Sequence, residues 1–246
     1  MVNSFIIKYI YSTLYIMAPL NVAVYLFPKA DILDFSGPTE IYSARPLDGS
    51  PAPFKITSFA HHNPVPADTG VLTYIPNATF AEIAQKIEEF DILVIPGAMF
   101  DTIADLVKSK EGKELLALLQ KFTNLKPRQE SGKRVLQSVC SGSIILAASG
   151  ILAGRDATTH HLGFDMLKQV ADEAAGGDSK INVLKTRWVD GGHTEAGVRI
   201  INAGGVSSGI DTSLFIVEEV VGKEAADWAA ELAEFDRRTT GYAQKA

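Results

Sequence analysis

Short apolar runs alternate with segments of helical spacing along most of the chain. The apolar runs predict strands at residues 21–27, 54–60, 91–95, 134–139, 182–189 and 198–202. The helical pattern predicts helices at residues 38–44, 79–87, 113–122, 144–149, 162–173, 210–221 and 224–237. Strands that alternate with helices indicate an α/β fold, in which helices cover both faces of a mainly parallel sheet.

Local signals at the ends of these segments support the pattern. Thr79 and Glu82 have the spacing of a capping box, Gly37 and Pro38 are typical of a helix start, and Gly150 is typical of a helix end. Ligands of parallel sheets bind at the carboxyl ends of the strands. We therefore expect the functional loops at residues 28–37, 96–101 and 140–143.

The N-terminal segment differs from the rest of the chain. Residues 1–16 are apolar and aromatic, with Lys8 as their one charge. They are too short to span a bilayer and lack the basic region and cleavage site of a signal peptide. We predict an extension over residues 1–18, packed loosely or in an oligomer contact, followed by one α/β domain over residues 19–246. A targeting or membrane-surface role for the extension stays open.

Composition excludes several functional classes. The 246 residues carry a net charge of −6 without a basic cluster, which argues against a nucleic-acid partner. The one cysteine, Cys140, cannot form an intramolecular disulfide, which argues against a disulfide-rich secreted domain. We expect a cytoplasmic protein with no stable membrane association.

Cys140 lies between a predicted strand and a predicted helix, among the small residues Ser141, Gly142 and Ser143. A lone cysteine is most often a small buried hydrophobic residue. The sharp turn of a nucleophile elbow, however, requires small neighbours in this arrangement. The start of the following helix should also favour the thiolate and lower the pKa of the thiol. The pattern therefore predicts that Cys140 is a nucleophile.

Four stretches resemble the ThiJ/PfpI superfamily, whose flavodoxin-like three-layer fold is related to class I glutamine amidotransferase domains. They are LFPKADILDFSGPTEIYS, ILVIPGAMF, SVCSGSIILAASGILAGRDATTHH and INAGGVSSGIDTSL, in this order along residues 20–223. The Asp-Phe-Ser-Gly-Pro segment, the Cys-Ser-Gly-Ser turn and the Ala-Thr-Thr-His segment resemble the isocyanide (isonitrile) hydratase branch most.

The resemblance implies a role for particular residues. It assigns the nucleophile to Cys140 and its acidic partner to Asp34, and it aligns Ser141 with a threonine of the hydratases. The loop after the central strand reads Pro-Gly-Ala instead of Pro-Gly-Gly, and we expect the N–H groups of Gly97 and Ala98 to form an oxyanion hole. His160 matches a histidine of many superfamily members. Peptidase-like members carry a histidine directly after the cysteine, so Ser141 argues against peptidase activity.

We expect a cofactor-independent hydro-lyase that hydrates a small isocyanide to an N-formamide through a thioimidate on Cys140. One alternative is a glyoxalase III-like conversion of methylglyoxal to lactate, assisted by His160. Another is redox sensing through oxidation of Cys140. The resemblance also implies a homodimer.

Less specific interpretations exist for several of these residues. Asp34 could cap the helix that follows it, and His160 could be structural. The adjacent pairs His61–His62 and His160–His161 would point to opposite faces of a strand, so neither forms a chelate alone, and we predict no metal site. Gly204 and Gly205 lack a phosphate-binding motif and predict close backbone packing near the site.

Overall fold

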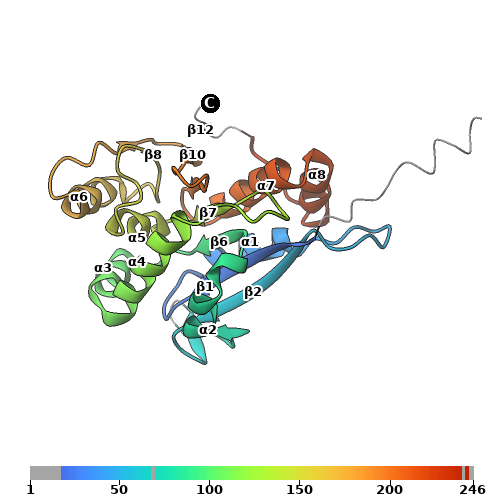
Figure 1. Cartoon of the computed structure of the whole chain (residues 1–246), viewed down its shortest axis with the longest axis horizontal. Helices are drawn as coiled ribbons and strands as arrows, with labels where there is room; N and C mark the ends of the chain where they lie inside the picture. The colour runs from blue at the N-terminus through green and yellow to red at the C-terminus, as the bar shows by residue number, and fades with distance from the viewer. Residues whose placement is uncertain (1–17, 68–69, 240–241, 244–246) are drawn as a thin grey trace, which may run out of the picture.

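The structure is a computed structural model that describes residues 18–67, 70–239 and 242–243 (Figure 1). Its helices are α1 (Ile32–Tyr42), α2 (Phe80–Gln85), α3 (Phe100–Lys108), α4 (Lys110–Thr123), α5 (Gly142–Ala148), α6 (Phe164–Ala175), α7 (Ser208–Val220) and α8 (Lys223–Leu232). Its strands are β1 (Leu20–Leu26), β2 (Phe54–Ala60), β3 (Val65–Ala67), β4 (Leu72–Tyr74), β5 (Ala78–Thr79), β6 (Ile92–Ile95), β7 (Val135–Ser138), β8 (Asp156–Ala157), β9 (Asn182–Val183), β10 (Trp188–His193), β11 (Arg199–Ala203) and β12 (Tyr242–Ala243). The predicted extension falls almost entirely on residues 1–17, which lie outside the described residues.

An eight-stranded sheet forms the centre, in the order β12-β10-β11-β7-β6-β1-β2-β5. Neighbouring strands run parallel except β10 and β11, which are antiparallel. The middle strand β6 is buried along its whole length, as its continuous apolar run predicted.

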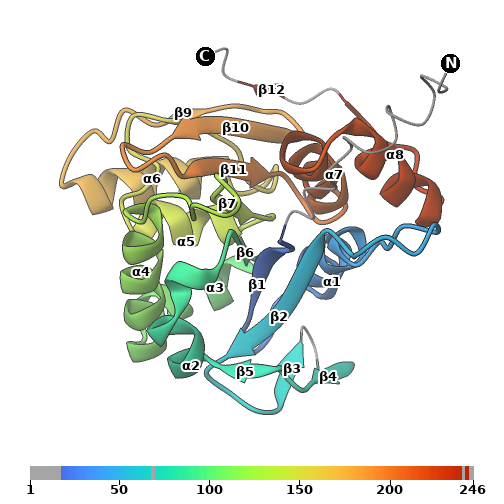
Figure 2. The same ribbon diagram turned by 45° about the vertical axis from the view of Figure 1, so that its right-hand side comes forward.

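Helices cover both faces of this sheet, which gives three layers. Helices α1, α7 and α8 pack together on one face, and α3, α4, α5 and α6 pack on the other (Figure 2). The predicted α/β, flavodoxin-like fold is confirmed. Among the described residues, the helices are all too short or too polar to cross a bilayer.

The predicted start of the first helix is wrong. The helix was expected to open at Gly37 and Pro38, but α1 begins at Ile32 with Asp31 as its N-cap, and Pro38 lies inside it. A proline in a helix interior removes one backbone hydrogen bond. Burial of Phe35, Pro38 and Ile41 offsets that loss. Asp34 therefore lies in the first turn of α1 and not in a loop.

Other segments also differ from the prediction. The strand expected over residues 182–189 is divided between β9 and β10, and the helix expected over residues 224–237 ends at Leu232. The short strands β3, β4, β5, β8 and β12 were not predicted, and neither was helix α3. The capping box of Thr79 and Glu82 is confirmed at the start of α2, with both of its reciprocal hydrogen bonds.

Candidate active site

Cys140 occupies a strained turn between β7 and α5. Its φ angle is +56°, in the left-handed region that non-glycine residues seldom adopt. The Cys140 N–H donates to the Gly204 carbonyl at 2.9 Å, and the Gly142 N–H donates to the Val139 carbonyl at 2.9 Å. A Cβ atom on Gly142 would lie 2.4 Å from the Ile95 carbonyl oxygen, so only glycine fits there. The sharp turn predicted for a nucleophile elbow is confirmed, and the nucleophilic role of Cys140 stays a prediction.

Asp34 lies beside the sulfur, fully buried in the first turn of α1. Its Oδ2 accepts the Gly97 N–H at 2.9 Å, and its Oδ1 has no hydrogen-bonding nitrogen or oxygen among the described residues. Burial and the charge of Asp31 raise the pKa of Asp34 to about 7, although the Gly97 amide and the Cys140 thiol oppose the shift. Asp34 can therefore gain and lose a proton near neutral pH.

The thiol itself is not activated in the way the sequence suggested. Burial, and next the charge of Asp34, raise the pKa of Cys140 to about 12, although the N–H groups of Val206 and Ser141 donate to the sulfur and oppose the rise. We expected the start of α5 to lower this pKa, and that prediction is wrong. Cys140 is only 4% exposed, so loss of solvation outweighs the favourable amide dipoles. The carboxyl groups of Asp34 and Asp31 are the acidic groups near it.

Val206 contributes to the site without having been predicted. Its φ angle is +42°, which is a strained conformation for a β-branched side chain. Strain of this kind costs about 1–3 kcal/mol and persists where the surrounding structure holds it. Here the held backbone directs an N–H group at the Cys140 sulfur. The chain turns at Gly204 and Gly205 just before it, and a Cβ on Gly205 would lie 2.5 Å from the His160 ring, as expected from close packing.

Ser141 joins the elbow to the loop that follows β6. Its Oγ donates to the Ala98 carbonyl at 2.6 Å and accepts the Ala98 N–H at 2.9 Å. The side chain is fully buried. A Cβ on Gly97 would lie 2.5 Å from the Ser141 Oγ and 2.9 Å from Asp34 Oδ2, so the loop depends on glycine at that position.

These bonds bear on the oxyanion hole expected from Gly97 and Ala98. The Gly97 N–H is directed at Asp34, and the Ala98 N–H is directed at Ser141. Both groups therefore position other residues of the site. An oxyanion would bind to them only if these bonds were broken, so the expected role requires a rearrangement of the loop.

His160 lies at the side of the site. Burial and the neighbouring His161 lower the pKa of His160, whereas Asp31 opposes them. Its Nδ1 accepts the Leu162 N–H at 3.3 Å. The ring lines a cavity of about 630 Å³ together with Thr159, Gly205 and Val206. Thr159 in turn donates to the Cys140 carbonyl at 3.0 Å. Neither this cavity lining nor the hydrogen bonds among the described residues join His160 to the Cys140 sulfur.

The one group of residues in the described part of the chain that could bind a metal ion does not include the histidine pairs. One atom each of Asp31, Asp34 and Cys140 lie within 4.8 Å of one another, and this set could hold a divalent ion if the thiol lost its proton. His61 instead stacks on Phe80 at 3.8 Å, and His62 contacts Glu111 at 3.0 Å. The expectation of no metal stays a prediction.

Known proteins share this fold and parts of this sequence. The chain is 28% identical over 207 residues to the isonitrile hydratase of Pseudomonas putida, a match that covers 84% of this chain and 75% of that protein. It is 33% identical over 142 residues to an uncharacterised protein of Streptomyces lividans, covering 58% of this chain and 88% of that protein.

Solved structures of other proteins match the fold of this chain. A ThiJ/PfpI family protein from Pseudomonas syringae matches with a TM-score of 0.66 at 26% identity, over 92% of this chain and 78% of that one. Drosophila melanogaster DJ-1beta matches with a TM-score of 0.63 at 20% identity, over 89% and 99%, which concerns the fold alone. The DJ-1/PfpI family pattern matches residues 21–189, so the chain belongs to the DJ-1/PfpI family.

Proposed function

We propose that the protein hydrates a small isocyanide to an N-formamide, with Cys140 as nucleophile and Asp34 as acid and base. The observation that carries the proposal is the buried carboxyl of Asp34 beside the Cys140 thiol, with a pKa raised to about 7. The similarity to an isonitrile hydratase supports the same reaction.

The first step forms a carbon–sulfur bond. The Asp34 carboxylate takes the proton of the Cys140 thiol while the sulfur attacks the terminal carbon of the isocyanide. Asp34 then gives that proton to the same carbon, which leaves a thioimidate, R–N=CH–S–Cys140. One proton serves both transfers, so a group with a pKa near 7 suits the task at neutral pH. A soft sulfur nucleophile suits a weakly electrophilic carbon.

The second step uses water. Asp34, again a carboxylate, takes a proton from a water molecule that adds to the thioimidate carbon. Asp34 gives that proton to the nitrogen, which leaves the tetrahedral adduct R–NH–CH(OH)–S–Cys140. As the carbon–sulfur bond breaks, Asp34 moves the remaining hydroxyl proton to the departing sulfur, so that the carbonyl of the formamide forms and the Cys140 thiol is restored. Overall, one isocyanide and one water molecule give one N-formamide. The N–H groups of Val206 and Ser141, which donate to the sulfur, stabilise it as a leaving group.

Ser141 acts as a positioning residue in this scheme. Its paired bonds to Ala98 hold the loop whose Gly97 N–H orients Asp34. The carboxylate therefore keeps Oδ1 free of backbone donors and available to the reacting atoms.

The test is formamide production from a simple aliphatic isocyanide, followed by proton NMR with wild-type protein and Cys140→Ala. We expect turnover by the wild type and none above background by the variant. Ser149→Ala is the matched control, because Ser149 is buried at the end of the same helix and its hydroxyl donates to the Leu146 carbonyl at 2.7 Å, within the helix. Equal inactivity of wild type and Cys140→Ala would refute the proposal.

We further propose a cytoplasmic homodimer, as the family resemblance implies. Sedimentation equilibrium of the full chain measures its oligomeric state, and a mass of one chain at all concentrations would contradict the homodimer.

A further inference from the structure

A separate cavity of about 450 Å³ lies at the opposite edge of the sheet from Cys140. Pro53 and Phe54 line it, where β2 begins. Cys140, in contrast, follows the carboxyl end of β7. Since β2 and β7 belong to the parallel part of one sheet, these two positions lie at opposite edges. Figure 2 shows this edge between α8 and the loop that connects α1 to β2.

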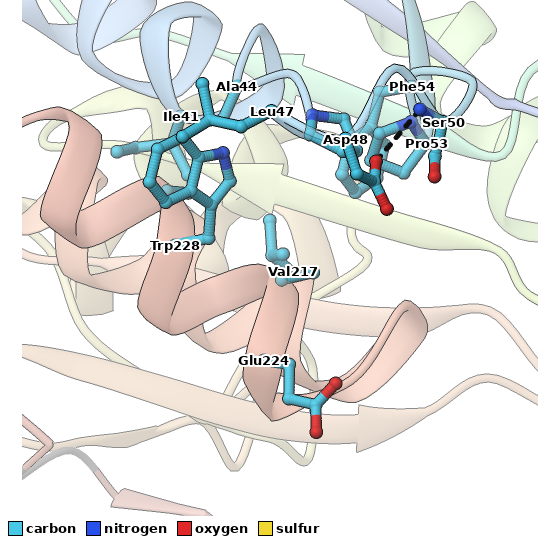
Figure 3. Close-up of a pocket in the computed structure, with 13 residues that line it drawn as sticks. Ile41, Ala44, Leu47, Asp48, Ser50, Pro53, Phe54, Val217, Glu224 and Trp228 are labelled. Carbon is cyan, nitrogen blue, oxygen red and sulfur yellow. Dashed lines mark hydrogen bonds between the residues drawn. The ribbon is translucent and has the colours of Figure 1, made fainter.

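The walls of this cavity are mainly apolar. Ile41 comes from α1, Leu47 from the following loop, Val217 from α7, and Trp228 from α8 (Figure 3). The Trp228 indole N–H donates to the Arg45 carbonyl at 2.8 Å, so its polar group is already satisfied. Leu47 is 83% exposed, which leaves a large apolar side chain at the rim without cover from the described residues.

Two carboxylates stand at the same rim. Asp48 and Glu224 both line the cavity and are exposed (Figure 3). Asp48 bonds the Ser50 backbone N–H at 2.9 Å, which holds the loop near the entrance. The rim therefore suits an apolar segment that carries positive charge.

The chain enters the described part of the structure beside this cavity. The Leu20 N–H donates to the carbonyl of Pro53, a wall residue, at 2.9 Å. Four residues of extended chain reach about 13 Å, so Ile16 is within reach of the cavity from Leu20. Residues 1–17 are rich in Ile and Tyr, and Lys8 is their one charged side chain.

We propose that the apolar segment of residues 1–17 docks into this cavity of its own chain. Its Ile, Leu and Tyr side chains cover Leu47, Val217 and Trp228, and Lys8 faces the rim carboxylates. Burial of apolar surface supplies the attraction, and the short connection to Leu20 keeps the local concentration of the segment high.

Cysteine cross-linking in the full chain tests this placement. In a Cys140→Ser background, Leu47→Cys is combined in turn with Tyr11→Cys, Leu14→Cys and Ile16→Cys. The matched control replaces Leu47→Cys by Leu162→Cys, because Leu162 is also an exposed leucine, 71% exposed, but lies before α6 on the other side of the molecule. After mild oxidation, non-reducing gels and mass spectrometry report disulfides within and between chains.

We expect at least one Leu47→Cys pair to form a disulfide within a single chain, at least tenfold faster than its Leu162→Cys control. A disulfide between chains would overturn the proposal, because a second copy would then supply the segment. Equal rates for both partners, or no disulfide with any of the three positions, would also overturn it.

Trp228 fluorescence gives a second measurement that needs no oxidation. Leu14→Asp and Ile16→Asp should expose Trp228 and shift its emission to longer wavelength, whereas the same changes in a Trp228→Phe background should leave the emission of the buried Trp188 unchanged. An unchanged Trp228 emission would contradict docking. Since the cavity and Cys140 lie at opposite edges, neither result depends on the proposed hydration.

Discussion

Two buried aspartates stand near opposite ends of β6 and are held very differently. Asp91, just before the strand, accepts the Asn21 N–H at 2.7 Å and the Ser131 hydroxyl at 2.6 Å, and pairs with Arg128 at 3.1 Å. Asp34, which contacts the loop after the strand, accepts the Gly97 N–H and faces the Cys140 thiol. Both carboxyls are fully buried. A cation and several donors hold the Asp91 carboxyl in place as part of the fold, whereas the Asp34 carboxyl has one backbone donor and the Cys140 thiol beside it.

Replacing Asp34 should separate activity from stability most clearly. We expect Asp34→Asn to lower kcat/KM for an aliphatic isocyanide by about 10³-fold, equivalent to about 4 kcal/mol, because the amide cannot carry the proton between sulfur and carbon. Steady-state assays measure this. Asp91→Asn, assayed at a temperature where it stays folded, is the control and should keep activity within about threefold of wild type. Comparable losses of kcat/KM in both variants would contradict the different roles proposed for Asp34 and Asp91.

The same carboxyl should make stability depend on pH. The folded-state pKa of Asp34, about 7, lies above its unfolded value of 3.8, so the folded protein binds the proton more tightly. Stability from this group is fully present below pH 4 and is lost as pH rises through 7, by at most about 4 kcal/mol. Urea unfolding of wild type and Asp34→Asn between pH 4 and pH 8 measures the difference. Identical pH profiles for the two proteins would contradict the raised pKa.

Asp91→Asn should instead lower stability. The change removes the buried charged partner of Arg128, which keeps only the exposed Glu130 at 3.5 Å among its ion pairs in the described residues, and it weakens the bonds from Asn21 and Ser131. We expect the free energy of unfolding to fall by about 2 kcal/mol. Urea unfolding at pH 7 measures it, with Asp48→Asn, an exposed aspartate, as the control that should change little. A loss below about 0.5 kcal/mol would show that Asp91 is not the structural clamp its contacts indicate.

Ser141→Ala should have the smallest effect, shared between stability and activity. The change leaves the buried N–H and carbonyl of Ala98 without the Ser141 hydroxyl, which costs about 1 kcal/mol. We expect kcat/KM to fall by about tenfold, because the loop that orients Asp34 loosens. Ser141→Thr keeps the hydroxyl and should restore most of the activity. No recovery in Ser141→Thr would argue that the small volume of Ser141, and not its hydrogen bonds, supports the site.

The sequence predicted those parts of the structure that depend on local pattern. The buried run of β6, the capping box of Thr79 and the small residues around Cys140 each act on neighbouring residues, so their signals survive in the sequence. The meeting of Asp34 with Cys140 came from the family resemblance and not from spacing, because the two residues are distant in the chain. Their catalytic roles remain proposals.

The parts that were missed depend on packing between distant segments. Val206 reaches the sulfur only because the turn before α7 is held in a strained conformation, and β-branched residues give no sequence signal for such a turn. Asp31 joins the site because α1 begins five residues before Gly37. The thiol pKa was misjudged because burial depends on the whole fold around the elbow, whereas the helix start is visible locally.

Because the chain has a single cysteine, the rate of thiol labelling measures how often the structure around Cys140 opens. A thiol reagent has one cysteine to react with, Cys140, and this residue is 4% exposed. A bulky maleimide can react only when the elbow or the loops above it open transiently. Its labelling rate, divided by that of an exposed thiol of similar acidity, gives the fraction of time the site is open. In the proposed hydration, an isocyanide too large to enter without such opening would have its kcat/KM lowered by the same fraction.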